Sequence, residues 1–358
     1  MAEINRTIAE IKERYGPRVA RAFSDAMTQL RSDVVLRRVI EALESGDIER
    51  ALGALNIDEA VLASMRAELT AAFAEAGTSV TTLVRFDPPG ETRAVVRFNV
   101  ANPDAERRLR EWLGQEITDI SEKTRTAARE ALSEGFARGQ GPRQIALDVV
   151  GRIGPNGRRT GGVLGLNVPQ KNLVQTMRQA LSNDGFVDDN GRRIFWIKRD
   201  GTLGSNLTRR DRRFDRSILR LIREGGKPTR DQITKWTGRY ADSLLRLRGD
   251  TIARTETAAA TEQGRIEAFR QGVEAKGVPL QYVEKEWRHG GGGMMPREFH
   301  VAENSEVVQG IDTPFTLRSG VQMQHPHDPD APIKERANCT CSTLIRVNWA
   351  RARRDGVV

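Results

Sequence analysis

The sequence predicts a mainly α-helical protein whose N-terminal and middle regions carry a β-hairpin arm and whose C-terminal part is a small α+β domain. Hydrophobic residues recur at helical spacing over most of the first 77 positions. The pattern changes to runs of β-branched residues between 78 and 102, which is typical of strands. All four histidines and both cysteines lie between His289 and Cys341, so any chemistry is expected in the C-terminal part.

The first segment, residues 1–77, is expected to be a helical bundle. Its apolar stripe runs from Ile4 to Leu30 with the three-to-four spacing of one helix face. A break at 45–47 interrupts the pattern, which then resumes and ends at Gly77, a residue type common just after a helix.

Residues 78–102 are expected to form a β-hairpin or a projecting arm. Two β-branched runs, TSVTTLVRF and ETRAVVRFNV, flank Asp87-Pro88-Pro89-Gly90, a sequence typical of turns.

The third segment, 103–249, is expected to be a basic helical region with glycine-rich linkers. A long polar helix should run from Pro103 to Arg138. Six glycines and one proline between 151 and 165 predict a loop or linker.

The last folded segment, 250–348, is expected to be an α+β domain, followed by a frayed tail at 349–358. An alanine-rich helix should begin at Asp250, whose carboxylate would cap its first free amides. Short strands are expected within Gln281–Trp287, Glu306–Met323 and Cys341–Val347.

The charge is concentrated in the middle of the chain. The 358 residues carry a formal net charge of +9, and residues 151–250 hold 22 basic against 10 acidic residues. Within them, 208–223 predicts an amphipathic basic helix. This helix could contact double-stranded DNA without sequence preference, or it could be a solvated or protein-facing surface. The arginines in question are Arg209, Arg210, Arg212, Arg213, Arg216 and Arg220.

The sequence predicts a cytoplasmic product and no membrane contact. No apolar run reaches the roughly 18 residues of a membrane span, and the first residues lack the apolar centre of a secretory signal. One Cys-x-Cys pair is not a disulfide framework, which fits a reducing compartment.

The cysteines and histidines allow a metal site. Cys339 and Cys341, with His300 and either His325 or His327, would supply the four nitrogen and sulfur ligands that zinc prefers. Small buried cysteines are also frequent in ordinary protein cores. A hydrolytic metal of a nuclease at His325-Pro326-His327-Asp328 is a further alternative, although no paired carboxylates accompany these residues.

Arg254 and Glu256 lie two residues apart on the predicted alanine-rich helix, so they point to different faces and cannot pair with each other. We therefore expect one of them to bond to the region of His300 or Asn338. Such a bond would fix the helix against the C-terminal strands.

The order of these C-terminal motifs resembles the phage Mu F-like, head morphogenesis family of minor head proteins of tailed phages. The motifs are 247–270, Lys285-Glu286-Trp287, Arg297-Glu298-Phe299-His300, Pro314-Phe315, His325-Pro326-His327-Asp328-Pro329 and Asn338-Cys339-Thr340-Cys341. The chain departs from the family pattern at Gly290–Met295, where that pattern has an acidic residue and a basic turn, and at His325, where it has a tyrosine.

The resemblance implies a minor capsid protein that acts in head assembly or in DNA loading and delivery. Its partners would be the portal protein, the major capsid or scaffolding protein and packaged DNA, and its location would be the virion head near the portal. No enzymatic turnover is expected, since the sequence lacks the arginine, Ser-Thr-Ser and glutamate set of ADP-ribosyl transferases. The structural motif residues are Arg254, Glu256, Trp287, Arg297, His300, Asp328, Asn338, Cys339 and Cys341.

Overall fold

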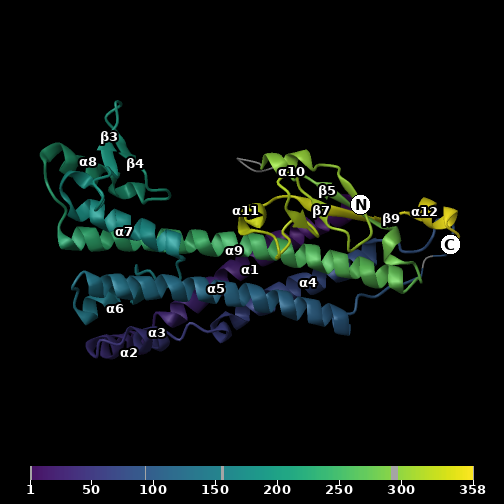
Figure 1. Ribbon diagram of the computed structural model, residues 1–358, viewed down its shortest axis with the longest axis horizontal. Coiled ribbons are helices and arrows are strands. Elements are labelled where there is room, and N and C mark those ends of the chain that lie inside the picture. Colours follow the sequence, from purple (N-terminus) through teal and green to yellow (C-terminus); the bar gives the residue numbers. More distant parts are fainter. Residues whose placement is uncertain (1, 93, 155–156, 292–296, 358) are drawn as a thin grey trace. The chain divides into compact units, whose positions relative to one another are not determined.

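The computed structural model describes residues 2–92, 94–154, 157–291 and 297–357 (Figure 1). The predicted fold class is confirmed: the described chain is mainly helical, with small antiparallel sheets and a C-terminal α+β part. Part of the predicted Gly290–Met295 loop, together with Pro296, lies outside the described residues.

The long helices provide most of the fold. The α-helices are α1 (Ala2–Leu30), α2 (Asp33–Glu44), α3 (Ile48–Ala54), α4 (Ala63–Leu83), α5 (Pro103–Ala137), α6 (Pro142–Val150), α7 (Val168–Ser182), α8 (Asp215–Glu224), α9 (Arg230–Glu274), α10 (Glu298–Ala302), α11 (Ile333–Arg336) and α12 (Trp349–Arg354). The described residues also contain four short 3-10 helices: η1 (Glu59–Leu62), η2 (Asp184–Phe186), η3 (Arg212–Phe214) and η4 (Leu280–Tyr282).

The strands are short and all their pairings are antiparallel. They are β1 (Arg152–Ile153), β2 (Arg159–Thr160), β3 (Phe195–Ile197), β4 (Leu203–Ser205), β5 (Val283–Arg288), β6 (Val307–Gln309), β7 (Phe315–Thr316), β8 (Gln322–Met323) and β9 (Ser342–Val347). Three pairs, β1-β2, β3-β4 and β7-β8, form two-stranded sheets. The remaining sheet has three strands in the order β6-β5-β9, and it contains the strands predicted within Gln281–Trp287 and Cys341–Val347.

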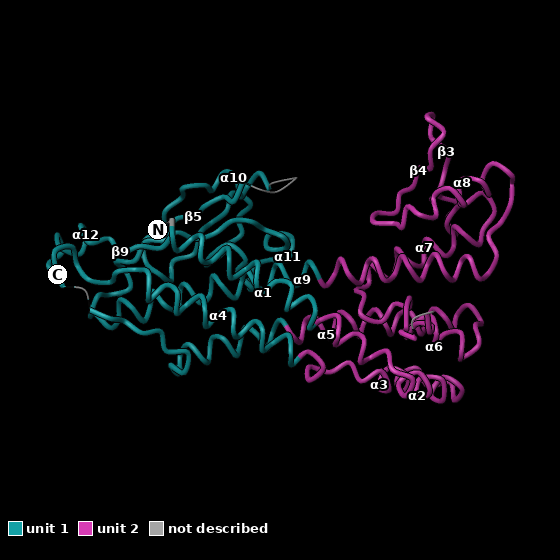
Figure 2. Tube along the Cα trace, turned by 180° about the vertical axis from the view of Figure 1, so that it is seen from behind, with its two compact units in different colours: residues 1–22, 63–116, 250–358 teal, residues 23–62, 117–249 magenta. Residues whose placement is uncertain are grey.

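The described chain separates into two compact units, coloured in Figure 2. Unit 1 comprises residues 1–22, 63–116 and 250–358, and unit 2 comprises 23–62 and 117–249. Helices α1, α5 and α9 contribute residues to both units. Neither unit coincides with one of the five consecutive segments expected from the sequence.

The predicted stripe of α1 and the predicted long helix α5 are both found. Every member of the stripe, from Ile4 to Leu30, is buried. Helix α5 buries Leu109, Trp112 and Leu113 at the same spacing, because helices of this length are stabilised chiefly by one apolar face.

Helix α9 begins twenty residues before the predicted start at Asp250, so that prediction was wrong. Asp250 is exposed in the helix interior and does not cap it. No proline follows Pro228 until after the helix, and the buried residues Trp236, Tyr240 and Leu244 continue the helical spacing upstream. This apolar face keeps the chain helical through Asp250.

Within unit 1, α9 packs directly on the backbone of α4. A Cβ at Gly264 would lie 2.3 Å from the carbonyl oxygen of Phe73 and 3.2 Å from Ala76 Cβ. Only glycine fits such an approach. The buried alanines at 258–260 continue the same thin helix surface.

The predicted β-hairpin at 78–102 is not present among the described residues, and α4 instead continues to Leu83. The β-branched residues between 78 and 83 are helical because Val80 is buried and the ring of Phe98 lies against Gly77. Packing outweighs strand propensity there. The following segment packs on helices rather than on itself, with Phe86 against Phe269 at a ring-centroid distance of 5.3 Å.

Two other predictions were wrong in extent. The basic helix predicted from Thr208 starts as 3-10 helix η3 at Arg212 and as α-helix only at Asp215, because Arg209 has a φ of 60° and the side chain of Asp211 caps η3. The tail predicted to fray forms α12, which is capped by Asn348 and buries Ala352.

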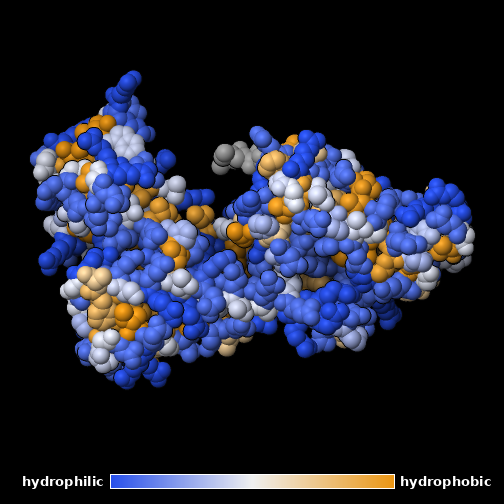
Figure 3. Space-filling model, viewed as in Figure 1, coloured by the Kyte–Doolittle hydropathy of each residue, from blue (hydrophilic) through white to orange (hydrophobic). Residues whose placement is uncertain are grey.

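No helix among the described residues is long and apolar enough to cross a membrane. On the face of the described chain that Figure 3 shows, hydrophobic residues gather only in small groups between hydrophilic ones.

Candidate functional site

The register of the C-terminal sheet brings two distant segments together. Strands β5 and β9 pair antiparallel, and the last pair joins Arg288 to Ser342. The next residues outward are therefore His289, just after β5, and Cys341, just before β9. Their side chains are close, with His289 Nδ1 3.6 Å from Cys341 Sγ.

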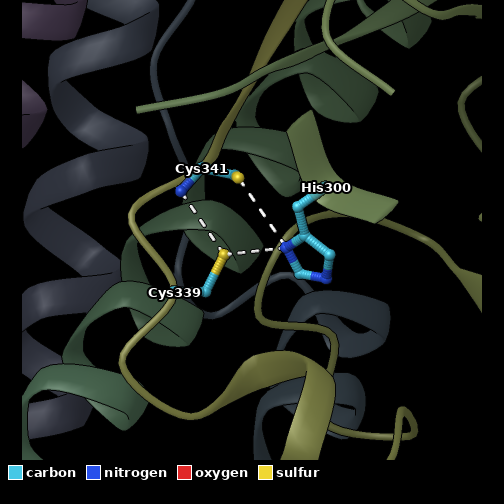
Figure 4. A group of neighbouring side chains, drawn as sticks. All are labelled: His300, Cys339 and Cys341. Atoms are coloured by element: carbon cyan, nitrogen blue, oxygen red, sulfur yellow. Dashed lines mark hydrogen bonds between the residues drawn. The ribbon is translucent and has the colours of Figure 1, made fainter. Parts of the chain in front are cut away.

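Helix α10 adds His300 to this position, where its ring packs edge-on against Trp287 with the centroids 5.2 Å apart. His300 Nδ1 lies 3.4 Å from Cys339 Sγ and 3.8 Å from Cys341 Sγ (Figure 4). The backbone amide of Cys341 also donates to Cys339 Sγ, at 3.4 Å. Three of the four predicted metal ligands therefore converge.

The other nitrogen of His300 faces a carboxylate. Nε2 lies 3.2 Å from Glu335 Oε2, and both side chains are buried. When Nε2–H donates to this carboxylate, Nδ1 keeps its lone pair toward the two sulfurs.

The cluster of His300, Cys339 and Cys341 can hold a metal ion, because its ligand atoms all lie within 4.8 Å of one another. His300 and Cys341 are buried, and Cys339 is half-buried. One imidazole and two thiolates form a soft donor set of the kind that binds zinc or other thiophilic metals.

The two thiols differ in acidity. The hydrogen bond to Cys341, together with burial, raises the pKa of Cys339. The hydrogen bond from Cys339 lowers the pKa of Cys341 to about 7, although burial opposes this shift. Cys341 is therefore the thiol of the pair that ionises more readily, because its neighbour can donate a hydrogen bond to the thiolate.

A buried ion network lies next to this cluster. Arg336, at the end of α11, contacts Glu116 of α5 at 2.7 Å and Glu256 of α9 at 3.2 Å. All three side chains are at most 7% exposed. Burial and the neighbouring Glu116 raise the pKa of Glu256 to about 8, against the effect of Arg336. With Glu256 protonated, one cation faces one carboxylate and the group is neutral.

A second network joins α9 to β9 about two turns further along α9. Glu262 accepts from the amide of Thr343, and Arg265 donates to the Thr343 carbonyl. Burial alone would raise the pKa of Glu262, but Arg265 and Lys12 lower it to about 2, so it is a carboxylate. Both networks hold α9 against the segment that contains the two cysteines.

The other residues of the predicted structural motif lie around these networks. The amide of Asn338 donates to Thr255 Oγ1 at 3.2 Å, next to Glu256. Arg297 donates to the carbonyls of Lys334 and Ala337, at the two ends of α11. Arg254 is exposed on α9, so it is Glu256 that bonds close to Asn338.

The second histidine motif is buried but lies outside the thiol cluster. His327 Nε2 is 3.1 Å from the Cys341 carbonyl oxygen, and His325 Nδ1 is 2.7 Å from that of Pro326. Asp328 accepts from the amide of Gln324 and thereby closes the turn. His325 thus stands apart from the three residues with which it was grouped as a ligand.

Four residues of this region were not singled out in the sequence: His289, Glu335, Arg336 and Glu116. His289 could have been found from the strand pairing, because it is in register with Cys341. The other three lie in polar stretches without a distinctive pattern, so no sequence signal marked them.

The predicted DNA-contacting arginines are divided between ion pairs and solvent. Arg210 pairs with Asp215 at 2.8 Å, and Arg213 pairs with Asp211 at 2.7 Å. Arg209, Arg212, Arg216 and Arg220 are exposed.

Three of these arginines, Arg210, Arg212 and Arg213, also line an open cleft of about 930 Å³ in unit 2. Strand β1 and helices α7 and α9 supply further basic residues, so that eight basic and four acidic side chains line it.

Comparison with known proteins does not indicate a function for the chain. No protein-family model matches the chain. No solved structure matches it either. A stretch of 98 residues is 35% identical to "Uncharacterized protein YqbB" of Bacillus subtilis (strain 168) and covers 27% of this chain and 30% of that relative. The chain therefore spans less than a third of the relative that it matches.

The buried carboxyl of Glu256 should make stability depend on pH. Its folded-state pKa is raised from 4.5 to about 8, so the folded protein keeps a proton that the unfolded chain releases in this range. Stability should therefore fall as the pH rises from about 5 to 8, by up to about 1.4 kcal/mol per pH unit.

Glu256→Gln keeps the side-chain shape and removes this titration. The free energy of unfolding of the variant should therefore increase relative to that of wild type as the pH rises from about 5 to 8. Urea unfolding at several pH values measures the difference, and Glu274→Gln, at an exposed position of α9, is the control. Parallel curves for wild type and Glu256→Gln would contradict the interpretation.

Proposed function

We propose that this chain is a minor head protein of a tailed phage or phage-derived particle, related to the phage Mu F-like, head morphogenesis proteins. In this proposal it assembles beside the portal protein, contacts the major capsid or scaffolding protein, and serves head assembly or DNA loading and delivery. It would reach the virion head after synthesis in the host cytoplasm.

The observation that carries most weight is the junction between α9 and the C-terminal elements. Residues about 80 positions apart meet there, Glu256 with Arg336 and Thr255 with Asn338. His300 meets the two cysteines, which lie about 40 positions further along the chain. Several of the residues behind the resemblance, among them Glu256, His300 and Cys341, are thus buried in one assembly. Buried ionic contacts of this kind fix one relative orientation of the elements that they join, which suits a docking scaffold without turnover.

We also propose that the metal held by His300, Cys339 and Cys341 is zinc. Thiolate and imidazole ligands favour zinc in a reducing compartment, since zinc is not itself reduced or oxidised there. The carboxylate of Glu335 supports this proposal, because histidines that bind zinc usually donate their other ring N–H to such a group.

Non-specific binding of double-stranded DNA is a second candidate function, favoured by the basic cleft. Arg212, Lys235 and Arg246 are exposed on the cleft and have no ion pair within the described chain. Such unpaired charges can neutralise phosphates and release counterions. The paired Arg210 and Arg213 would instead hold the walls of the cleft in place.

The head-protein proposal is tested by isolating particles from the phage or prophage that encodes the chain. Peptides of this chain should co-sediment with the portal protein at a few copies per particle, and cryo-microscopy should place its density beside the portal. Intact, DNA-filled particles that lack the chain in mass spectrometry would refute the proposal.

The zinc proposal is tested by metal analysis of the protein produced with zinc in the medium. About one zinc per chain is expected, because the cluster forms one site. The Cys339→Ser, Cys341→Ser double variant should contain almost none. Wild-type protein without stoichiometric zinc would contradict the proposal.

The DNA proposal is tested by exchanging the three unpaired cleft residues for glutamine. Each lost phosphate contact should make the negative slope of log K against log salt less steep by about 0.9, and affinity at low salt should fall. Fluorescence anisotropy with duplex DNA at several salt concentrations measures both quantities.

The matched control removes the same charge from exposed, unpaired positions of unit 2 outside the cleft. These positions are Arg37, Arg38 and Arg143. A cleft variant that binds DNA like this control would exclude the cleft as the binding surface.

A further inference from the structure

We infer that His289 is the fourth ligand of the zinc site and that it closes the site, which makes the metal a structural one. This inference rests on the proposed zinc at His300, Cys339 and Cys341. It replaces His325 by a residue that the sheet register, rather than a sequence motif, brings to the site.

Three separations between a cysteine sulfur and a histidine nitrogen fit tetrahedral coordination. Zinc binds sulfur at about 2.3 Å and imidazole nitrogen at about 2.0 Å, so ligand atoms of one tetrahedral site lie roughly 3.3–3.8 Å apart. The two sulfur–nitrogen distances of His300 are 3.4 and 3.8 Å, and His289 Nδ1 is 3.6 Å from Cys341 Sγ. All three distances lie within that range.

The backbone around His289 is built for this approach. Its amide donates to the side chain of Asn304 at 3.0 Å, which fixes the position just after β5. A Cβ at Gly290 would lie 2.0 Å from the Thr340 carbonyl oxygen, so only glycine allows the chain to pass against the Cys339–Cys341 segment. The ring of His289 is half-exposed and can turn toward the remaining ligand atoms when a metal binds.

Hydrogen bonds outside the ligand set complete the arrangement. Glu335 orients His300 through Nε2, and the Cys341 amide donates to Cys339 Sγ. Such partners set the tautomer of a ligand histidine and stabilise a thiolate, and their loss typically weakens metal binding about 10- to 100-fold.

A Cys₂His₂ set leaves no open position for substrate, which distinguishes structural from catalytic zinc. The four ligands come from the end of β5, from α10 and from the segment before β9. One metal would therefore tie together three parts of unit 1.

The experiment compares His289→Gln with His325→Gln in the full-length protein, using zinc and cobalt as probes. In wild type, cobalt should give the intense visible bands of tetrahedral coordination. His289→Gln should weaken zinc affinity at least about 10-fold, since a lost ligand costs no less than a lost hydrogen-bonding partner, and should reduce these bands. His325→Gln should leave the bands and the affinity unchanged.

Circular dichroism of each variant confirms that it is folded. Glu335→Gln removes the hydrogen-bonding partner of His300 and should weaken zinc affinity about 10- to 100-fold. If wild type binds zinc and His289→Gln retains its affinity and its cobalt spectrum, the fourth-ligand inference fails while the zinc proposal stands. If wild type binds neither metal, both fail. Loss of binding in His325→Gln with no change in His289→Gln would restore the ligand set that the sequence motif indicated.

Discussion

The guanidinium of Arg336 is a permanent charge in a region from which water is excluded, and the arrangement of unit 1 depends on how that charge is compensated. Glu116 provides the compensating carboxylate, and Glu256 accepts a further hydrogen bond from the guanidinium, so two different long helices contact it. Removing one partner of a buried ion pair typically costs about 3–5 kcal/mol, since the other charge stays buried. Helices α5 and α9 and the short helix α11 are therefore held in one arrangement, and the cysteine segment follows directly after α11.

The same geometry explains why the thiol cluster forms beside the ion network. Arg336 and Thr255 fix the chain at 336–338, and Thr343 is fixed to Glu262 and Arg265. The cysteines lie between these two anchored points, so their positions are determined on both sides. A metal bound there would further stabilise a segment that is already ordered. The anchoring contacts and the metal together would keep a docking scaffold rigid.

The sequence predicted the parts of the fold in which one physical signal dominates. The apolar stripe of α1, the long helix α5 and the strands β5 and β9 follow from residue pattern, whereas the pairing of β5 with β9 does not. The arm predicted at 78–102 was wrong because tertiary packing of Val80 and Gly77 keeps β-branched residues helical. The start of α9 was missed because Asp250 resembles a cap, whereas the apolar face upstream of it continues the helix.

The candidate site was predictable only in part, for a similar reason. His300, Cys339 and Cys341 were grouped by residue type, and the structure brings them together. His289 required the strand register, and Arg336 and Glu116 required knowledge of which helices become neighbours. Residue chemistry can be read from a sequence, but the pairing of distant polar residues depends on the packing of their elements.

The contact at Gly264 has a mechanical consequence for unit 1. Side chains between packed helices can change rotamer and let one helix shift along another. Here the carbonyl of Phe73 meets bare backbone, and displacing α9 by one residue would drive a side chain into that carbonyl. Gly264 thus fixes the position of α9 along the axis of α4. A force along the helix would be resisted by contact between the two backbones, which cannot relax by a change of rotamer.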